Sequence, residues 1–151
     1  AVLPFRVSHD AAEPVAYRFS CGEKSVAVAT DLGYYDDYIV DHLRGLDAVL
    51  IESNHDINML QVGSYPYYLK QRILGRKGHL SNDNAGRLLG EILNDRMKAV
   101  MLGHLSRENN YEELAMATVC TEITDGDNPN KATDFPIQIA KRDEPSELIA
   151  V

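Results

Sequence analysis

The feature that most constrains the fold is the alternation of short apolar runs with segments of helical character. Six runs have the length and apolar character of single β-strands, and they span residues 2–7, 15–20, 25–30, 47–52, 98–102 and 135–140. Helices are predicted over residues 35–45, 66–75, 82–95 and 107–119, and a polar loop over 124–134. This order predicts α/β layers, with the paired strands at the front adding an α+β character, rather than an all-helical or all-β fold.

The tetrapeptide Gly-His-Leu-Ser occurs twice, at residues 78–81 and 103–106. Each copy is predicted to open a helix, with Ser81 and Ser106 as the N-caps, because a serine hydroxyl accepts hydrogen bonds from the first free backbone N–H groups of a helix. The glycine before each histidine is expected to let the backbone turn sharply and present the imidazole.

Length and composition indicate one domain that spans residues 1–151. The chain is 44% hydrophobic, which is enough for a core, and it has no apolar run long enough to span a membrane. No secretory leader is recognisable, and two cysteines are too few for a disulfide framework, so we expect a reducing, cytoplasmic setting. The net charge of −8 disfavours a simple electrostatic nucleic-acid binder but is compatible with a metal site.

Polar residues follow several of the predicted strands directly. Asp31, Glu52 and His104 come at the ends of three apolar runs, His9 follows the first run, and His79 belongs to the repeated tetrapeptide. The carboxyl ends of strands in an open α/β sheet form the ligand crevice, so these side chains are expected to converge there. Imidazole and carboxylate together suit Zn²⁺ or Mn²⁺.

Each of these residues also has a structural interpretation. A histidine after a strand is more often hydrogen-bonded within the structure than bound to a metal. Asp31 before Leu-Gly fits turn chemistry, and Glu52 fits a surface carboxylate. The shared position at strand ends favours a metal site, but spacing alone leaves both interpretations open.

Several segments, in their order and spacing, resemble the metallo-β-lactamase-fold hydrolases, and most closely the YycJ/WalJ-type exonuclease branch, which is related to tRNase Z. The likeness covers nearly the whole chain, and no single motif is decisive. It is carried by Pro4-Phe-Arg-Val-Ser-His-Asp10, Ala29-Thr-Asp-Leu-Gly33, Glu52-Ser-Asn-His-Asp56, Ser64-Tyr-Pro66, Gly78-His-Leu-Ser-Asn82 and Leu102-Gly-His-Leu-Ser106.

The resemblance implies a role for each converging residue. His9, Asp31 and His104 correspond to metal ligands, with Asp31 in the position of the aspartate that bridges two divalent ions, Zn²⁺ or Mn²⁺. Glu52 and His79 correspond to a carboxylate–histidine pair that assists proton transfer. Two cations that hold a hydroxide and neutralise a phosphodiester would suit this arrangement.

One departure from the family pattern is large, because the signature His-x-His-x-Asp-His motif does not occur in these 151 residues. The family fold is a four-layer αββα sandwich of two similar halves, and the chain resembles mainly the C-terminal half. We therefore expect an N-terminal half of the same protein as a partner. We also expect that the chain alone binds metal weakly and turns over no substrate.

A basic segment immediately before His79 suggests how an acidic protein could hold a phosphate backbone. Its members, which are equally compatible with a solvated helix face, are Lys70, Arg72, Arg76 and Lys77. These charges favour a nuclease, and DNA is expected as its substrate in preference to RNA. The alternatives are a hydrolase of thioesters, lactams or lactones, and a metal-free binding domain that has lost the site.

Overall fold

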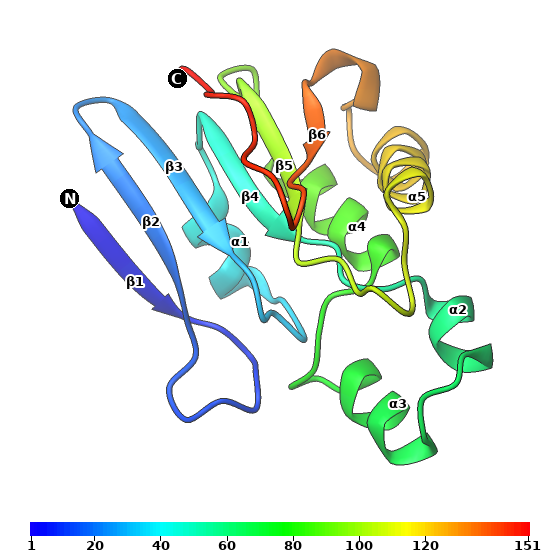
Figure 1. Cartoon of the computed structure of the whole chain (residues 1–151). Coiled ribbons are helices and arrows are strands. Elements are labelled where there is room, and N and C mark those ends of the chain that lie inside the picture. Colours follow the sequence, from blue (N-terminus) through cyan, green and yellow to red (C-terminus); the bar gives the residue numbers. More distant parts are fainter.

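In a computed structural model, which describes residues 1–151, the chain forms one six-stranded sheet with helices behind it and below it (Figure 1). The strands are β1 (Val2–Arg6), β2 (Val15–Cys21), β3 (Lys24–Ala29), β4 (Ala48–Glu52), β5 (Ala99–Gly103) and β6 (Ile137–Ile139). The helices are α1 (Asp37–Leu43), α2 (Ile57–Val62), α3 (Tyr67–Leu74), α4 (Asn82–Ile92), α5 (Glu112–Asp125) and the short 3₁₀ turn η1 (Ala132–Asp134). This confirms the mixed α/β class.

The strand order in the sheet is the order in the sequence, from β1 to β6. The β1–β2 and β2–β3 pairs are antiparallel, whereas β3, β4, β5 and β6 run parallel to one another. The carboxyl ends of β1, β3, β4 and β5 therefore reach the same edge of the sheet, where the connecting loops can place side chains from distant parts of the sequence together.

The core lies between the sheet and the helices behind it. Val49, Ile51, Val100 and Leu102 alternate toward this side and share one buried cluster with the apolar stripe of α4, which includes Leu88 and Leu89. Full burial of a leucine or isoleucine side chain contributes about 1.5–3 kcal/mol. This packing fixes the strand ends relative to α4, whose N-terminus follows His79.

The opposite face of the sheet is apolar but largely uncovered near β1, β2 and β3. Tyr17 and Phe19 remain 42% and 39% exposed, and the register pairs them with Val28 and Val26 on the same face. The C-terminal segment crosses in front of β4 and β5 (Figure 1). The chain thus forms a single sheet with one apolar face that remains partly exposed.

Both boundaries of the last predicted helix were wrong. The helix predicted over 107–119 is α5, which begins at Glu112 and ends at Asp125. Ser106 does not cap it, because its hydroxyl instead accepts a hydrogen bond from Asn109 N within the preceding loop, at 3.2 Å. Only the first Gly-His-Leu-Ser copy opens a helix directly, with Ser81 accepting from Asn84 N. Helix α2, which Asp56 caps, was not predicted from the sequence. None of the helices combines the length and apolar character that crossing a membrane requires.

Candidate metal and catalytic site

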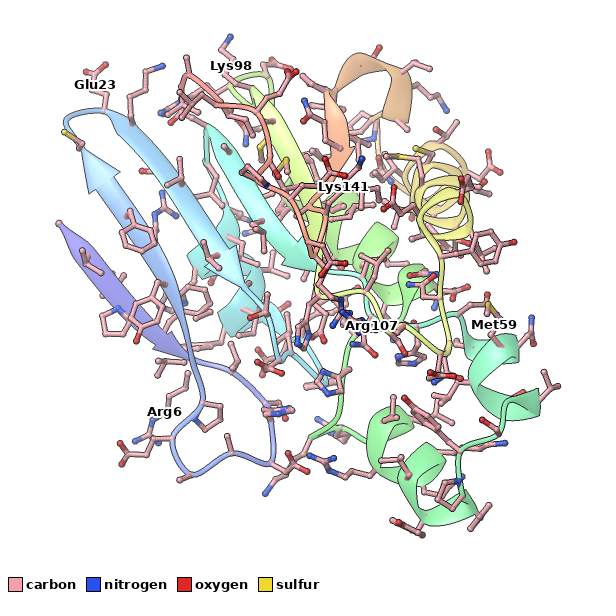
Figure 2. The ribbon with its side chains drawn as sticks, in the orientation of Figure 1. Arg6, Glu23, Met59, Lys98, Arg107 and Lys141 are labelled. Atoms are coloured by element: carbon pink, nitrogen blue, oxygen red, sulfur yellow. The ribbon has the colours of Figure 1, made fainter.

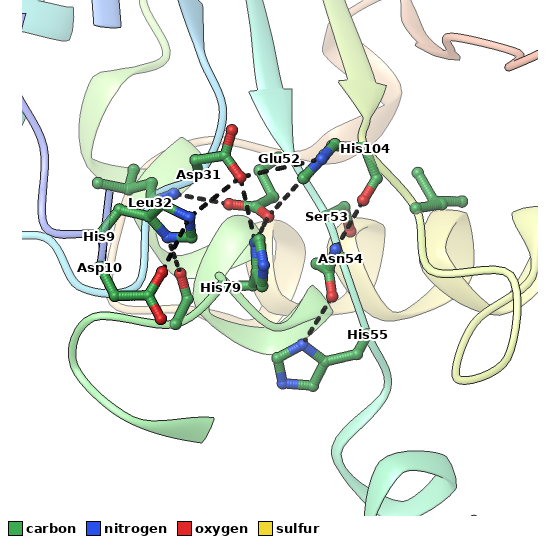
Figure 3. Close-up of polar contacts among 12 residues, drawn as sticks. His9, Asp10, Asp31, Leu32, Glu52, Ser53, Asn54, His55, His79 and His104 are labelled. Carbon is green, nitrogen blue, oxygen red and sulfur yellow. Dashed lines mark hydrogen bonds and ion pairs between the residues drawn. The ribbon is translucent and has the colours of Figure 1, made fainter. Parts of the chain in front are cut away.

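Five polar residues gather at the carboxyl edge of the sheet (Figure 3). Asp31 follows β3, Glu52 ends β4 and His104 follows β5, while His79 precedes α4. One ligand atom from each of these four lies within 4.8 Å of the others. The fifth residue, His9, follows β1, and its Nε2 lies 3.6 Å from Oδ1 of Asp31. The structure therefore brings together all five residues singled out from the sequence.

Glu52 is a fully buried carboxylate with three hydrogen-bond donors around it. Its Oε1 accepts from Nδ1 of His79 at 2.6 Å and from Nδ1 of His104 at 2.9 Å. Its Oε2 accepts from the backbone N–H of Leu32 at 2.8 Å, which ties the loop after β3 to the end of β4. Because both Nδ1 atoms donate to Glu52, each of these histidines is left with Nε2 available for a cation or a proton.

Asp31 is the common neighbour of three imidazoles. Its Oδ1 lies 3.6 Å from His9 Nε2, 3.7 Å from His79 Nδ1 and 3.9 Å from His104 Nε2. Nδ1 of His9 donates to the carbonyl of Gly78 at 2.9 Å, so Nε2 is the ring atom that faces Asp31. One carboxylate oxygen among imidazole nitrogens is a donor set that suits a divalent transition-metal ion, so the residues present fit the metal that the resemblance implies.

The backbone at two of these positions is in the left-handed region. Asp31 has φ 55° and His104 has φ 57°, and neither is a glycine. Such a conformation costs a side-chain-bearing residue roughly 1 kcal/mol or more and persists where the surroundings enforce it. At His104, Asn54 Nδ2 donates to the carbonyl oxygen at 2.9 Å and holds the turn. Backbone strain of this kind is typical of functional sites.

Gly33 and Gly78 bring the loop of Asp31 against the loop of His79. A Cβ at Gly33 would lie 2.4 Å from the backbone N of Gly78, and a Cβ at Gly78 would lie 2.1 Å from the carbonyl oxygen of Ile73. The glycine before His79 is therefore required by close backbone approach, whereas the left-handed turn expected near the second glycine is adopted by His104 itself.

The charges of the site are set by Glu52. Burial opposes the ionisation of Glu52, but the hydrogen bonds from His104 and His79 hold the pKa of its carboxyl below the ordinary value. In turn, the hydrogen bond to Glu52 raises the pKa of His104, although partial burial opposes the rise. Glu52 is thus an ionised carboxylate at neutral pH, and it favours the protonated form of His104.

His55 is buried beside the site but does not face the cluster. Its Nδ1 lies 3.3 Å from Asn54 Oδ1, and its carbonyl oxygen accepts from Asn82 N at 2.9 Å. Burial lowers the pKa of His55 to about 4. His55 therefore stays neutral near neutral pH and links the extension of β4 to the start of α4.

This burial predicts acid sensitivity. An unfolded histidine takes up a proton near pH 6.5, but folded His55 does so only near pH 4, so the unfolded state binds more protons in between. Unfolding free energy should fall by about 3 kcal/mol across that window, and His55→Gln should remove this part of the slope. Urea unfolding at several pH values measures it, with His42→Gln, on a partly exposed histidine of α1, as the control. An unchanged slope in His55→Gln would contradict the assignment.

The basic segment is divided among different surroundings. Arg72 pairs with Asp10, and Lys70 Nζ donates to the carbonyl of Gln61. Arg76 lies over the ring of Tyr34 at 3.8 Å. Lys77 lines a hollow beside His9. Substrate binding by these four residues stays a prediction, and only Arg72 lines the cleft that contains His79 and His104.

A buried amide network behind the site was not foreseen from the sequence. Asn82 and Asn110 exchange side-chain hydrogen bonds of 2.9–3.0 Å, and Ser53 Oγ donates to Asn82 Oδ1 at 2.6 Å. Asn110 also donates to the carbonyls of Ser53 and Asn54. This network fixes the end of β4 against α4 and the loop before α5, and it thereby positions Glu52 and His104.

Comparison with known proteins gives close relatives. The chain is 45% identical over 123 residues to exodeoxyribonuclease WalJ of Streptococcus pneumoniae. The aligned residues make up 82% of the chain and 46% of the relative. It is 43% identical over 118 residues to exodeoxyribonuclease YycJ of Bacillus anthracis, covering 78% of the chain and 45% of the relative. The chain is homologous to part of the WalJ/YycJ exodeoxyribonucleases. It spans about half the length of these relatives, and no family model matches it.

Solved structures agree on the fold of this WalJ/YycJ relative. The metallo-β-lactamase fold protein YhfI of Bacillus subtilis superposes with a TM-score of 0.60 at 16% identity, over 93% of the chain and 45% of YhfI. Zn²⁺-bound PqqB of Methylobacterium extorquens superposes with a TM-score of 0.54 at 16% identity, over 90% of the chain and 47% of PqqB. The chain therefore has part of the metallo-β-lactamase fold, as the resemblance implied.

Proposed function

We propose that the full-length protein containing this chain is a metal-dependent phosphodiesterase that degrades DNA as an exonuclease. The observation that carries the proposal is the single carboxylate oxygen of Asp31 facing three imidazoles, beside a buried carboxylate that orients two of them. The exodeoxyribonuclease relatives support DNA as the substrate. A cytoplasmic location is part of the proposal, and it is compatible with Cys21 and Cys120, which are both unpaired.

His9, Asp31 and His104 would hold two divalent cations, Zn²⁺ or Mn²⁺, with Asp31 between them. When bound, such ions supply an activated hydroxide and offset the negative charge of a phosphodiester. The chain's own residues orient the histidines and transfer a proton. Glu52 fixes Nδ1–H of His79, so Nε2 of His79 is the atom that passes a proton to the departing sugar oxygen. His104 is oriented by the same carboxylate.

The site is proposed to be completed by the rest of the full-length protein. The curated relatives are about twice as long as this chain, and the open apolar face that carries Tyr17 and Phe19 is suited to a second sheet. That other half would supply the further metal ligands of the His-x-His-x-Asp-His motif and would cover this face.

The proposal predicts metal-dependent release of nucleotides from end-labelled DNA by the full-length protein. Chelation by EDTA should abolish the release, and Asp31→Asn should lower it by at least about 10²-fold because the shared ligand loses its charge.

Residues 1–151 alone should bind metal weakly and show no turnover, and adding the other half of the protein should restore turnover. Cleavage of a thioester or lactone without any cleavage of DNA would support an acyl hydrolase instead. Full-length protein that binds DNA but does not cleave it with either Zn²⁺ or Mn²⁺ would indicate a binding domain.

A further inference from the structure

A cleft of about 470 Å³ opens beside His79 and His104 and is lined by charged side chains that the site above does not use. Arg107 and Arg142 form part of its wall, together with Tyr65. Arg107 lies on the loop that follows β5, at the carboxyl edge of the sheet and between it and α3 (Figure 2). Arg142 comes from the segment after β6, far away in the sequence.

A second hollow of about 390 Å³ lies on the other side of the same loop. It shares His104, Arg107 and Arg142 with the first and adds Tyr111, which is half-exposed. The two arginines therefore stand between adjoining hollows, and His104 is common to both. A tyrosine thus lines each hollow, Tyr65 the first and Tyr111 the second.

These two arginines have weaker charged partners than Arg72, although the carboxylate of Glu108 also lines the cleft. Arg72, the third arginine of the cleft, is neutralised by a two-point contact with Asp10. Arg142 instead donates to the carbonyl of Leu105, a group without net charge. Arg107 lies 3.6 Å from Asp143, and both side chains are mostly exposed. In a chain of net charge −8, two weakly compensated guanidinium groups beside the imidazoles form a local site for anions.

We propose that Arg107 and Arg142 bind backbone phosphates of single-stranded DNA adjacent to the scissile phosphate, while Tyr65 stacks on an unpaired base. The inference rests on the proposed function and deepens it. Guanidinium groups suit phosphate oxygens because of their planar, paired donors, and stacking on an aromatic ring is indifferent to base identity. These contacts would hold and position the DNA strand without a preference for its base sequence.

The test is binding of a short fluorescein-labelled oligothymidylate to the full-length protein in EDTA, followed by anisotropy at several NaCl concentrations. Arg107→Gln and Arg142→Gln should each weaken binding about fivefold near 0.1 M NaCl and reduce the salt slope by about 0.7. In cleavage assays with metal, each should raise KM by a similar factor and leave kcat within about twofold. Arg142→Lys should retain the salt slope, since it keeps the charge.

Arg44→Gln is the matched control. Arg44 is as exposed as Arg107 and has an exposed partner, Asp41, at 3.0 Å. It follows α1 and precedes the amino end of β4, whereas the cleft lies at the carboxyl ends of the strands. It should leave binding, salt slope and KM unchanged. If the wild type cleaves DNA but the two cleft variants behave like the control, the inference is overturned and the proposed function stands. If the wild type neither binds nor cleaves DNA, the proposed function itself fails. A fall in kcat with unchanged KM would show that Arg142 only supports the His104 loop.

Discussion

Replacing Glu52 by glutamine in the full-length protein is expected to lower kcat for DNA cleavage by about 10²–10³-fold. The carboxylate accepts from Nδ1 of His79, Nδ1 of His104 and the N–H of Leu32, so all three neighbours are donors. A glutamine amide must point its NH₂ group at one of these donors. The substitution therefore removes the charge that orients both imidazoles and leaves a buried donor without an acceptor.

The same change should reduce the free energy of unfolding by about 1–3 kcal/mol, because an unsatisfied buried donor retains its desolvation cost. Kinetics on labelled DNA and urea unfolding measure the two effects separately. Glu91→Gln is the control, since Glu91 accepts from Tyr35 on the exposed surface of α4 and takes no part in the cluster. If Glu52→Gln kept kcat within threefold of the wild type, Glu52 would not orient the reacting histidines.

Gly78→Ala is expected to cost about 3 kcal/mol of unfolding free energy, a large effect for the addition of one methyl group. The new Cβ would lie 2.1 Å from the carbonyl oxygen of Ile73 and 2.3 Å from that of Arg72. Both are backbone atoms at the end of α3, and the first of them also accepts from His79 N at 3.1 Å. Relief of the clash must move the loop that places His79 against Glu52.

Urea unfolding of the purified variant measures this cost. Gly75→Ala, three residues earlier, serves as the control because its Cβ would lie 3.1 Å from its nearest neighbour, which asks for a shift of only a few tenths of an ångström. We expect it to cost less than about 1 kcal/mol. Equal effects of the two substitutions would show that glycine is required here for chain flexibility rather than for close approach.

Local patterns in the sequence were sufficient to predict the sheet. Each strand is a short apolar run with a clear boundary, so the six strands and the helices α1, α3 and α4 fall close to their predicted positions. The helix α2 was missed because six residues give too little periodicity to distinguish it from a loop. The start of α5 was misplaced because Ser106 is a strong local cap, whereas the end of the loop before α5, at Asn110, is held by contacts with Ser53 and Asn54 after β4, which are remote in sequence.

The residues of the cluster were predictable because strand ends converge wherever parallel strands share a sheet. What could not be predicted is the set of partners that each residue takes. Glu52 was compatible with a surface carboxylate, yet it is fully buried. The hydrogen bond between Asn82 and Asn110 joins positions 28 residues apart. The cleft is lined by Arg107 and Arg142, which are 35 residues apart. No local pattern encodes such contacts, which follow only from the packing of the whole domain.

The left-handed backbone of Asp31 sets stability and function against each other. Glycine adopts that conformation without steric cost, so a glycine at Asp31 would relieve roughly 1 kcal/mol of strain while deleting a side chain that the site needs. At His104 the same relief is outweighed by the loss of its hydrogen bond to buried Glu52. A library of variants selected only for resistance to heat should therefore enrich glycine at Asp31, and the members that carry it should be inactive. Asp31 would have to be held constant in any attempt to engineer a more heat-resistant form of this protein.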